Sequence, residues 1–319
     1  MIDTMAEKLT FTICTPLYNE AERVKPLYRS LDAQSERSFE WLVIDDGSGD
    51  GGADEAEKLG ENASFPVRVI RKKNHRGSHV AVNKAAEEAR GKFLLVLHSD
   101  EELLPQSLER FLNHWESIPS AERPFFTSVT GLSQTHDGTV RGDKFPADIF
   151  DSTNFEAGGR YGISGRKFGF QRTEVLKEFS FPEKKGERFC PTELVLNRVG
   201  LRYLTRYVNE ALVTVHTAEE EDTPRKAEMG ALDRDVPPME MCILGPAGSA
   251  LFFRELMSLP VPLARKIKAA IAYVRLSLHA GQIPDDIYKE APRKLFVFFA
   301  LTPGFFLYRR DIQKGIQAP

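Results

Sequence analysis

The residues best placed for chemistry are Asp100, Glu101 and Glu102, which close the segment KFLLVLHSDEE at 92–102. A continuous apolar run that ends in charge predicts a buried strand that delivers acids to the edge of a sheet. Ligands of open α/β sheets bind at the carboxyl ends of the strands. Carboxylates there suit a hard cation such as Mg²⁺ or Mn²⁺ beside phosphate oxygens. The alternative is a solvated turn between a strand and a helix.

Two earlier apolar runs also end in polar residues. Residues 9–15 (LTFTICT) lead into PLYNE, and residues 39–45 (FEWLVID) lead into DGSGDG. Both runs predict strands, and the glycines at 47 and 51 are typical of the turn itself because glycine tolerates positive φ. Repetition of the pattern favours a ligand site over three unrelated turns.

The segments between the runs have the spacing of helices. Residues 20–34 carry apolar side chains at Val24, Leu27 and Leu31, and a further strand at 66–71 precedes a helix at 78–90. The first hundred residues therefore predict the order β-α-β-α-β-α-β. Right-handed crossovers would gather the polar loops along one edge of a parallel sheet.

Length and charge suggest a large α/β domain with an appendage. The chain has 319 residues, 41% of them hydrophobic, and a net charge of −3. Residues 260–319 hold ten Lys and Arg against four Asp and Glu, so the C-terminal part is basic. Segment 218–238 is acidic and contains prolines, which predicts a linker between a main domain at 1–217 and a helical region at 239–319.

The helical region contains two apolar segments. Residues 263–279 alternate apolar and basic side chains, and LFVFFALTPGFFLY at 295–308 is expected to break at Pro303 and Gly304. The second segment is shorter than the roughly 20 residues that a bilayer span needs. Two interpretations stay open: packing onto the main domain, or docking on an anionic membrane.

The three cysteines, Cys14, Cys190 and Cys242, have no metal-ligand spacing. Their odd number, and the lack of an apolar leader at the first residues, favour a reducing cytoplasm. Each cysteine is expected to fill core space.

Four ordered motifs together resemble the inverting family 2 glycosyltransferases with a GT-A fold. They are TPLYNE at 15–20, VIDDGSGDG at 43–51, the segment from Asn74 to Leu103, and FCPTELVLNRVG at 189–200. The resemblance covers residues 8–216, and segment 168–193 is similar to bacterial members that build surface polysaccharides. It implies a Rossmann-like, mostly parallel sheet flanked by helices, with the C-terminal helices appended.

The resemblance also implies a nucleotide-sugar site. It assigns donor binding to Thr15, Pro16, Tyr18, Glu20, Asp46, Asn74, Gly77, His98, Ser99 and Asp100. Asp46 would accept the imide proton of uracil, and Gly77 at a helix start would offer N–H groups to phosphate or ribose. Asn83 is placed well inside that helix and would bond a neighbouring loop.

Asp100 matches the last acid of the DxD motif, which implies a bound Mg²⁺ or Mn²⁺ that stabilises the departing nucleoside diphosphate. His98 stands where the family has the first acid, so nucleotide specificity and metal preference stay open. Glu101 and Glu102 are either part of this site or solvent-facing acids that cap a helix at 105–115.

Glu193 matches the acid that the family uses as general base on the acceptor hydroxyl. From the residues alone, a helix-start glutamate is also a partner of the helix dipole. Glu183 and Glu187 are the alternative bases. His216 either approaches the metal and diphosphate or has a structural role.

The sequence thus predicts a cytoplasmic, metal-dependent glycosyltransferase, peripheral to the inner face of the membrane. It would move a sugar from a UDP-sugar to a hydroxyl of a glycan or lipid-linked acceptor. The basic loop at 71–76 lacks the interleaved aromatic residues of nucleic-acid binding, and a homo-oligomer stays open. A nucleotidyltransferase or a non-catalytic protein on a degenerate transferase scaffold are the alternatives; a NAD-dependent enzyme is disfavoured because the first turn lacks GxGxxG.

Overall fold

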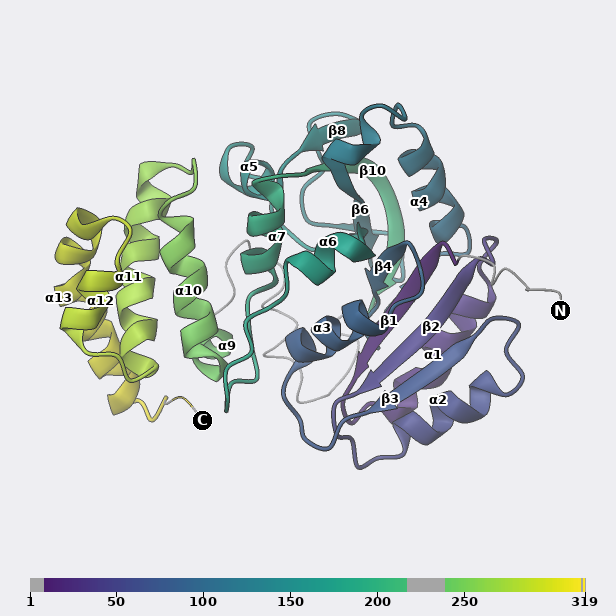
Figure 1. Ribbon diagram of the computed structural model, residues 1–319, viewed down its shortest axis with the longest axis horizontal. Helices are drawn as coiled ribbons and strands as arrows, with labels where there is room; N and C mark the ends of the chain where they lie inside the picture. Colours follow the sequence, from purple (N-terminus) through teal and green to yellow (C-terminus); the bar gives the residue numbers. More distant parts are fainter. Residues whose placement is uncertain (1–8, 217–238, 317, 319) are drawn as a thin grey trace, which may run out of the picture.

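The computed structural model describes residues 9–216, 239–316 and 318. Its N-terminal part is a mixed sheet with helices on both faces, and its C-terminal part is a group of helices (Figure 1). The predicted linker at 218–238 lies outside the described residues. In the part of the chain that is described, no helix combines the length and apolar character needed to cross a bilayer.

The first hundred residues follow the predicted order. The elements are β1 (Phe11–Leu17), α1 (Ala21–Asp32), β2 (Phe39–Asp45), α2 (Gly52–Gly60), β3 (Val67–Arg71), α3 (Ser78–Glu88) and β4 (Phe93–Val96). The four strands are parallel in the order β3-β2-β1-β4, so their carboxyl ends share one edge. This half of the fold prediction is confirmed.

The second half of the α/β part extends the sheet with strands of both directions. It comprises β5 (Glu101–Leu103), α4 (Ser107–Glu116), η1 (Arg123–Phe125), β6 (Phe126–Gln134), β7 (Val140–Arg141), β8 (Ile149–Ser152), α5 (Asn154–Gly159), β9 (Lys167–Arg172), α6 (Thr173–Glu178), α7 (Thr192–Gly200) and β10 (Leu204–Val215). Strand β9 runs antiparallel between β4 and β6, and β10 lies beside β6. These pairings join strands that are far apart in the sequence and extend the sheet beyond β4.

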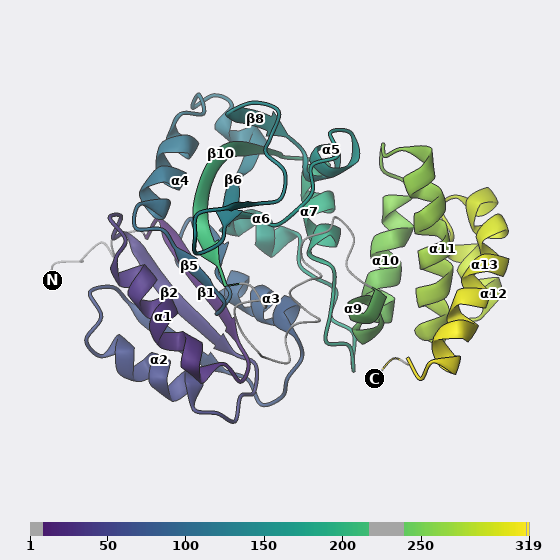
Figure 2. The same ribbon diagram turned by 180° about the vertical axis from the view of Figure 1, so that it is seen from behind.

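Both faces of the parallel strands are covered, which explains their continuous apolar runs. Helices α1 and α2 lie on one face, and α3 and α6 lie on the other (Figures 1 and 2). Side chains alternate between the layers: Ile13 and Leu17 pack with α1, while Cys14 packs on the α3 side. All three cysteines are buried free thiols, and burial raises the pKa of each. Their burial agrees with the prediction that they fill core space.

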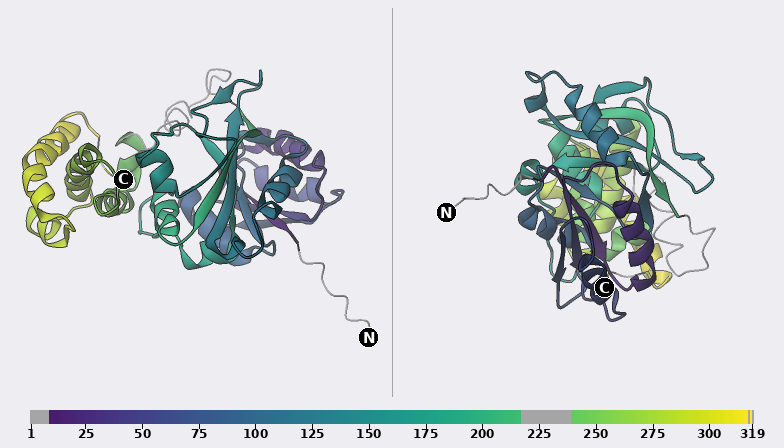
Figure 3. Two further views of the ribbon diagram at one scale, coloured as in Figure 1. Left: turned by 90° about the horizontal axis from the view of Figure 1, so that it is seen from above. Right: turned by 90° about the vertical axis from the view of Figure 1, so that its right-hand side faces the viewer.

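The C-terminal helices are α9 (Met239–Leu244), α10 (Pro246–Leu256), α11 (Leu263–His279), α12 (Pro284–Glu290) and α13 (Lys294–Gln313). The expected break at Pro303 and Gly304 is wrong, because α13 continues through both residues. Gly304 lets α13 approach α11 closely: a Cβ there would lie 2.7 Å from Val274 Cβ. Packing against α11 thus outweighs the backbone hydrogen bond that proline removes. Helix α13 lies at the end of the molecule farthest from the sheet (Figure 3).

Candidate active site

The loops that follow β1 and β2 are bonded to each other. The N–H of Asp46 donates to the carbonyl of Leu17 at 2.8 Å, and the N–H of Asn19 donates to Ser48 Oγ at 3.0 Å. Asn19 Oδ1 in turn accepts from the N–H of Gly49 at 2.9 Å. The polar loops therefore meet at one edge of the sheet, as predicted.

Asp46 holds the loop between β3 and α3. One carboxylate oxygen pairs with Lys72 Nζ; the other accepts the N–H groups of Arg76 at 2.9 Å and Gly77 at 2.7 Å and lies 2.9 Å from His75 Nδ1. Burial disfavours the charged carboxylate, but the bonds from His75, Lys72 and Arg76 outweigh this and hold its pKa below the usual range. A uracil imide would therefore compete with donors from the protein.

Gly77 meets two constraints that exclude other residues. Its φ is +91°, and a Cβ would lie 2.0 Å from the carbonyl oxygen of Arg188. Its N–H is already bonded to Asp46. The N–H of Gly77 itself thus points at Asp46 in the structure described, and the predicted role of this helix start in donor binding stays a prediction.

The predicted base pocket is only partly assembled. Tyr18 is exposed and stacks on the ring of His75, with ring centroids 3.7 Å apart, and Asn74 is exposed nearby. Thr15 and Pro16 are buried in β1. The hydroxyl of Thr15 accepts a bond from Trp41 Nε1 at 3.0 Å, and the donor contact predicted for this residue stays a prediction.

Glu20 and Ser99 tie the end of β1 to the turn after β4. The Ser99 hydroxyl donates to the Glu20 carboxylate, and both residues are buried. This bond fixes the turn that carries His98 and Asp100, which gives Glu20 and Ser99 a positioning role in the structure described.

Asp100 and Glu101 lie in and after this turn, because β4 ends at Val96 rather than running on to the acids. The Arg166 guanidinium is 2.6 Å from Glu101 Oε1 and 3.8 Å from Asp100 Oδ2. Glu101 is buried in β5, and the N–H of His98 donates to its carboxylate at 2.7 Å. Burial raises the pKa of Glu101 to about 7 against the opposing effect of Arg166. A solvent-facing, helix-capping Glu101 is therefore excluded.

Glu102 and His216 lie on the other side of Asp100. His216 Nε2 is 2.9 Å from Glu102 Oε1, and the N–H of His216 donates to the carbonyl of Asp100 at 3.0 Å. The carboxylate oxygens of Glu102 suit Mg²⁺ or Mn²⁺ when phosphates and water complete the shell, and the neighbouring imidazole could also ligate Mn²⁺. Within the described residues, no group of three or more His, Cys, Asp or Glu side chains is arranged to hold an ion by itself.

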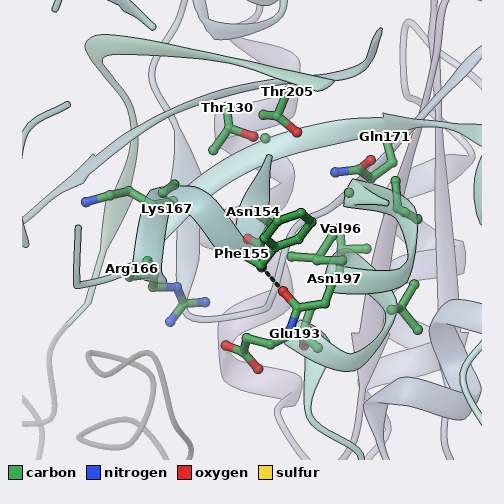
Figure 4. A pocket seen from close by; sticks show the side chains of 18 of the residues that line it. Val96, Thr130, Asn154, Phe155, Arg166, Lys167, Gln171, Glu193, Asn197 and Thr205 are labelled. Carbon is green, nitrogen blue, oxygen red and sulfur yellow. Dashed lines mark hydrogen bonds between the residues drawn. The ribbon is translucent and has the colours of Figure 1, made fainter. Parts of the chain in front are cut away.

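A cavity of about 350 Å³ opens beside this turn, between the sheet and helices α5, α7 and α10. Of the predicted site residues, His98 and Glu193 line it. Glu193 comes from the first turn of α7, and Asn154 Nδ2 donates to Asn197 Oδ1 at 2.9 Å, which joins α5 to α7 (Figure 4). The cavity thus brings the candidate base into the same space as the end of β4.

Sequence reasoning missed the residues that the antiparallel strands contribute to this cavity. They are Thr130 from β6, Arg166 directly before β9, Gln171 near the end of β9, and Thr205 from β10. Figure 4 shows all four side chains around the cavity together with Glu193. In the sequence these are polar residues in or beside apolar strands. That pattern does not show which strands pair with one another.

The alternative bases, Glu183 and Glu187, have structural partners. Glu187 accepts the N–H groups of Ala247 at 2.6 Å and Gly248 at 3.0 Å, at the start of α10. Glu183 pairs with Arg76 at 3.1 Å and accepts a bond from Asn83. Asn83 also exchanges bonds with the backbone of Phe181, which confirms its predicted contact with a neighbouring loop.

Comparison with known proteins defines the class. The profile of Glycosyl transferase family 2 matches residues 12–181, just over half of the chain. This chain therefore belongs to glycosyl transferase family 2, as its motifs indicated.

Two curated relatives are similar in sequence to part of the chain. An uncharacterized glycosyltransferase of Haemophilus influenzae is 32% identical over 34% of this chain and 35% of its own length. The putative teichuronic acid biosynthesis glycosyltransferase TuaG of Bacillus subtilis is 33% identical over 42% of this chain and 51% of its own. The matches thus span about a third to a half of these relatives.

The fold is similar to that of S. aureus TarS, residues 1–349, solved in complex with UDP-GlcNAc. The TM-score is 0.56 at 18% identity, over 96% of this chain and 92% of that chain. This likeness confirms the predicted GT-A fold.

Proposed function

We propose that this protein is a metal-dependent, inverting glycosyltransferase that moves a sugar from a UDP-sugar to a hydroxyl of a glycan or lipid-linked acceptor. The observation that carries the proposal is the shared cavity of His98 and Glu193, beside the turn of Asp100, in a family 2 chain. The alternatives, a nucleotidyltransferase and a non-catalytic scaffold, have no comparable support from the family.

Donor binding is assigned to the edge where the loops after β1, β2 and β4 meet. Tyr18 and His75 offer stacking surfaces for a base, and Asp46 lies behind them as the candidate imide acceptor. Asn74, which is exposed, and Pro16, which is buried in β1, complete the base side. His98 would contact ribose or phosphate through its imidazole.

Asp100 is the residue that would hold Mg²⁺ or Mn²⁺, with His216 and Glu102 beside it. A bound divalent cation would supply stabilisation of the negative charge on the departing diphosphate. Arg166 adds a positive charge at the same turn. This guanidinium is already in place there, so it would also stabilise the negative charge on the departing diphosphate.

Glu193 is the proposed general base. Inversion requires the acceptor hydroxyl to attack from the side opposite the leaving group, so its base must lie across the cavity from the diphosphate. Glu193 enters from α7, while the Asp100 turn enters from β4. A carboxylate within hydrogen-bond reach of the hydroxyl would remove its proton.

The proposed class of acceptor is inferred from the names of similar proteins. TuaG is named for teichuronic acid biosynthesis, and another relative is an undecaprenyl-phosphate 4-deoxy-4-formamido-L-arabinose transferase of Pseudomonas syringae. By analogy, we place this enzyme in the cytoplasm, where its three buried thiols would stay reduced, in assembly of surface glycans.

A thermal-shift panel of UDP-, GDP-, dTDP- and CMP-sugars, with and without Mn²⁺, tests the proposal. A bound ligand raises the unfolding temperature by mass action, and we expect the largest rise with a UDP-sugar plus Mn²⁺. Stabilisation by a GDP-, dTDP- or CMP-sugar alone would correct the donor, and no shift with any of them would contradict the function.

A further inference from the structure

Helix α13 is apolar on both sides, although the described residues cover only one of them. Its inner side packs Val297, Ala300 and Gly304 against neighbouring helices. Its outer side exposes five large apolar side chains: Leu295 (68%), Phe298 (59%), Phe299 (70%), Phe305 (49%) and Phe306 (68%). We call these five residues the α13 outer face. A helix with apolar residues all round is normally buried, so a covering partner is expected.

The α13 outer face is one continuous strip. Positions 295, 298, 299, 305 and 306 recur at intervals of three, four and seven residues, which keeps them on one side of an α-helix. The exposed Thr302 fills the gap in the strip. The strip therefore runs along most of the helix.

Positive charge brackets the α13 outer face at both ends. Arg293 and Lys294 lie at its start and Arg309 and Arg310 at its end, and all four are exposed. The single acid within α13, Asp311, is buried and bonded by Arg275 and His279. No acidic side chain of α13 is thus available to neutralise these cations.

This charge pattern argues against self-association through α13. Two copies packed face to face about a two-fold axis would place Arg309 and Arg310 against the same residues or against Arg293 and Lys294. Either arrangement brings like charges together, which is unfavourable. An anionic lipid surface offers the opposite charge and an apolar layer at once.

We infer that the α13 outer face docks in the plane of an anionic membrane. The four cations would contact phosphate headgroups, and the phenylalanines would enter the boundary of the acyl chains. The helix would lie flat, since the apolar stretch between Lys294 and Arg309 is too short to span a bilayer of about 30 Å. This inference is independent of the proposed reaction, because vesicle binding needs neither donor nor acceptor.

Cosedimentation of the full-length protein with lipid vesicles tests it. Wild type should pellet with phosphatidylglycerol–phosphatidylcholine vesicles, much less with phosphatidylcholine alone, and less as salt is added. The double variant Arg309→Glu/Arg310→Glu should bind at least about 30-fold more weakly, because each cation near the surface contributes to binding. The double variant Phe298→Ser/Phe306→Ser should lose binding by a comparable or larger factor.

Phe125→Ser is the matched control, because Phe125 is 64% exposed on η1 in the other part of the molecule. It should pellet as wild type does. Circular dichroism of each variant checks folding, and the exposed positions should leave it unchanged. Equal pelleting with both vesicle types, or none with either, would overturn the inference. A dimer in analytical ultracentrifugation that the Phe298→Ser/Phe306→Ser variant loses, without vesicle binding, would assign the face to a protein partner instead.

Discussion

The Arg166 guanidinium lies 2.6 Å from Glu101 Oε1 and joins the start of β9 to the turn after β4. Both side chains are largely shielded, with 14% and 2% of their surfaces exposed. Removing one member of a buried pair leaves the other charge uncompensated. The pair therefore fixes the wall of the cavity that lies next to Asp100.

Arg166→Gln should lower the free energy of unfolding by roughly 3–5 kcal/mol, as expected for a broken buried pair. Arg166→Gln combined with Glu101→Gln should cost less than the sum of the single variants, because the double variant no longer leaves Glu101 as an uncompensated buried charge. Urea unfolding of the four proteins measures this coupling. Additive effects would show that the two side chains act independently.

Glu193→Gln should keep donor binding and lower transfer by about 10²–10⁴-fold, because the amide cannot remove the acceptor proton. The rate of nucleotide release is measured with the donor that the thermal-shift panel identifies, at saturating acceptor. Glu183→Gln is the control and should keep the wild-type rate, since Glu183 contacts Arg76 and Asn83. Wild-type turnover by Glu193→Gln would remove this residue from the role of base.

Glu187→Ala should destabilise the protein without affecting donor affinity. Its carboxylate accepts two N–H groups at the start of α10, so its loss leaves those donors unpaired at the end of a helix. We expect a loss of about 1–3 kcal/mol in chemical unfolding. An unchanged unfolding midpoint together with a large loss of turnover would return Glu187 to the list of candidate bases.

Asp46 should make stability depend on pH in the acid range. Its folded-state pKa lies below the ordinary 3.8, so the unfolded chain binds the proton first as pH falls. The stability that the carboxylate contributes is complete above about pH 5 and declines as pH falls through 3.8 towards the folded-state pKa. The difference in unfolding free energy between wild type and Asp46→Asn should shrink over this window. A difference that stays constant there would contradict the assignment.

The parallel half of the fold could be predicted because its information is local. Each of β1, β2 and β4 is an apolar run with polar residues within two positions of its end, and helical spacing separates β1 from β2. Arg166 could not be predicted, because its approach to Glu101 depends on β9 pairing antiparallel with β4 and β6. Such pairings join residues far apart in the sequence.

Side-chain direction and packing account for two further features that the sequence did not predict. Thr15 belongs to the predicted strand, but alternation turns its hydroxyl towards Trp41. Pro303 and Gly304 are locally helix-breaking, yet close contact with Val274 keeps α13 continuous. In both cases a contact distant in sequence decided the outcome.

Calorimetric titration of UDP, with and without Mn²⁺, into wild type and Asp100→Asn tests the central claim most directly. Asp100 lies in a turn, next to Arg166 and the backbone of His216, so loss of its charge should leave the fold intact. Wild type should bind UDP more tightly with Mn²⁺ than without it, and Asp100→Asn should lose this enhancement while its unfolding temperature stays close to that of wild type. Mn²⁺-dependent UDP binding of equal strength in the two proteins would contradict the assignment of the nucleotide-sugar and metal site to Asp100.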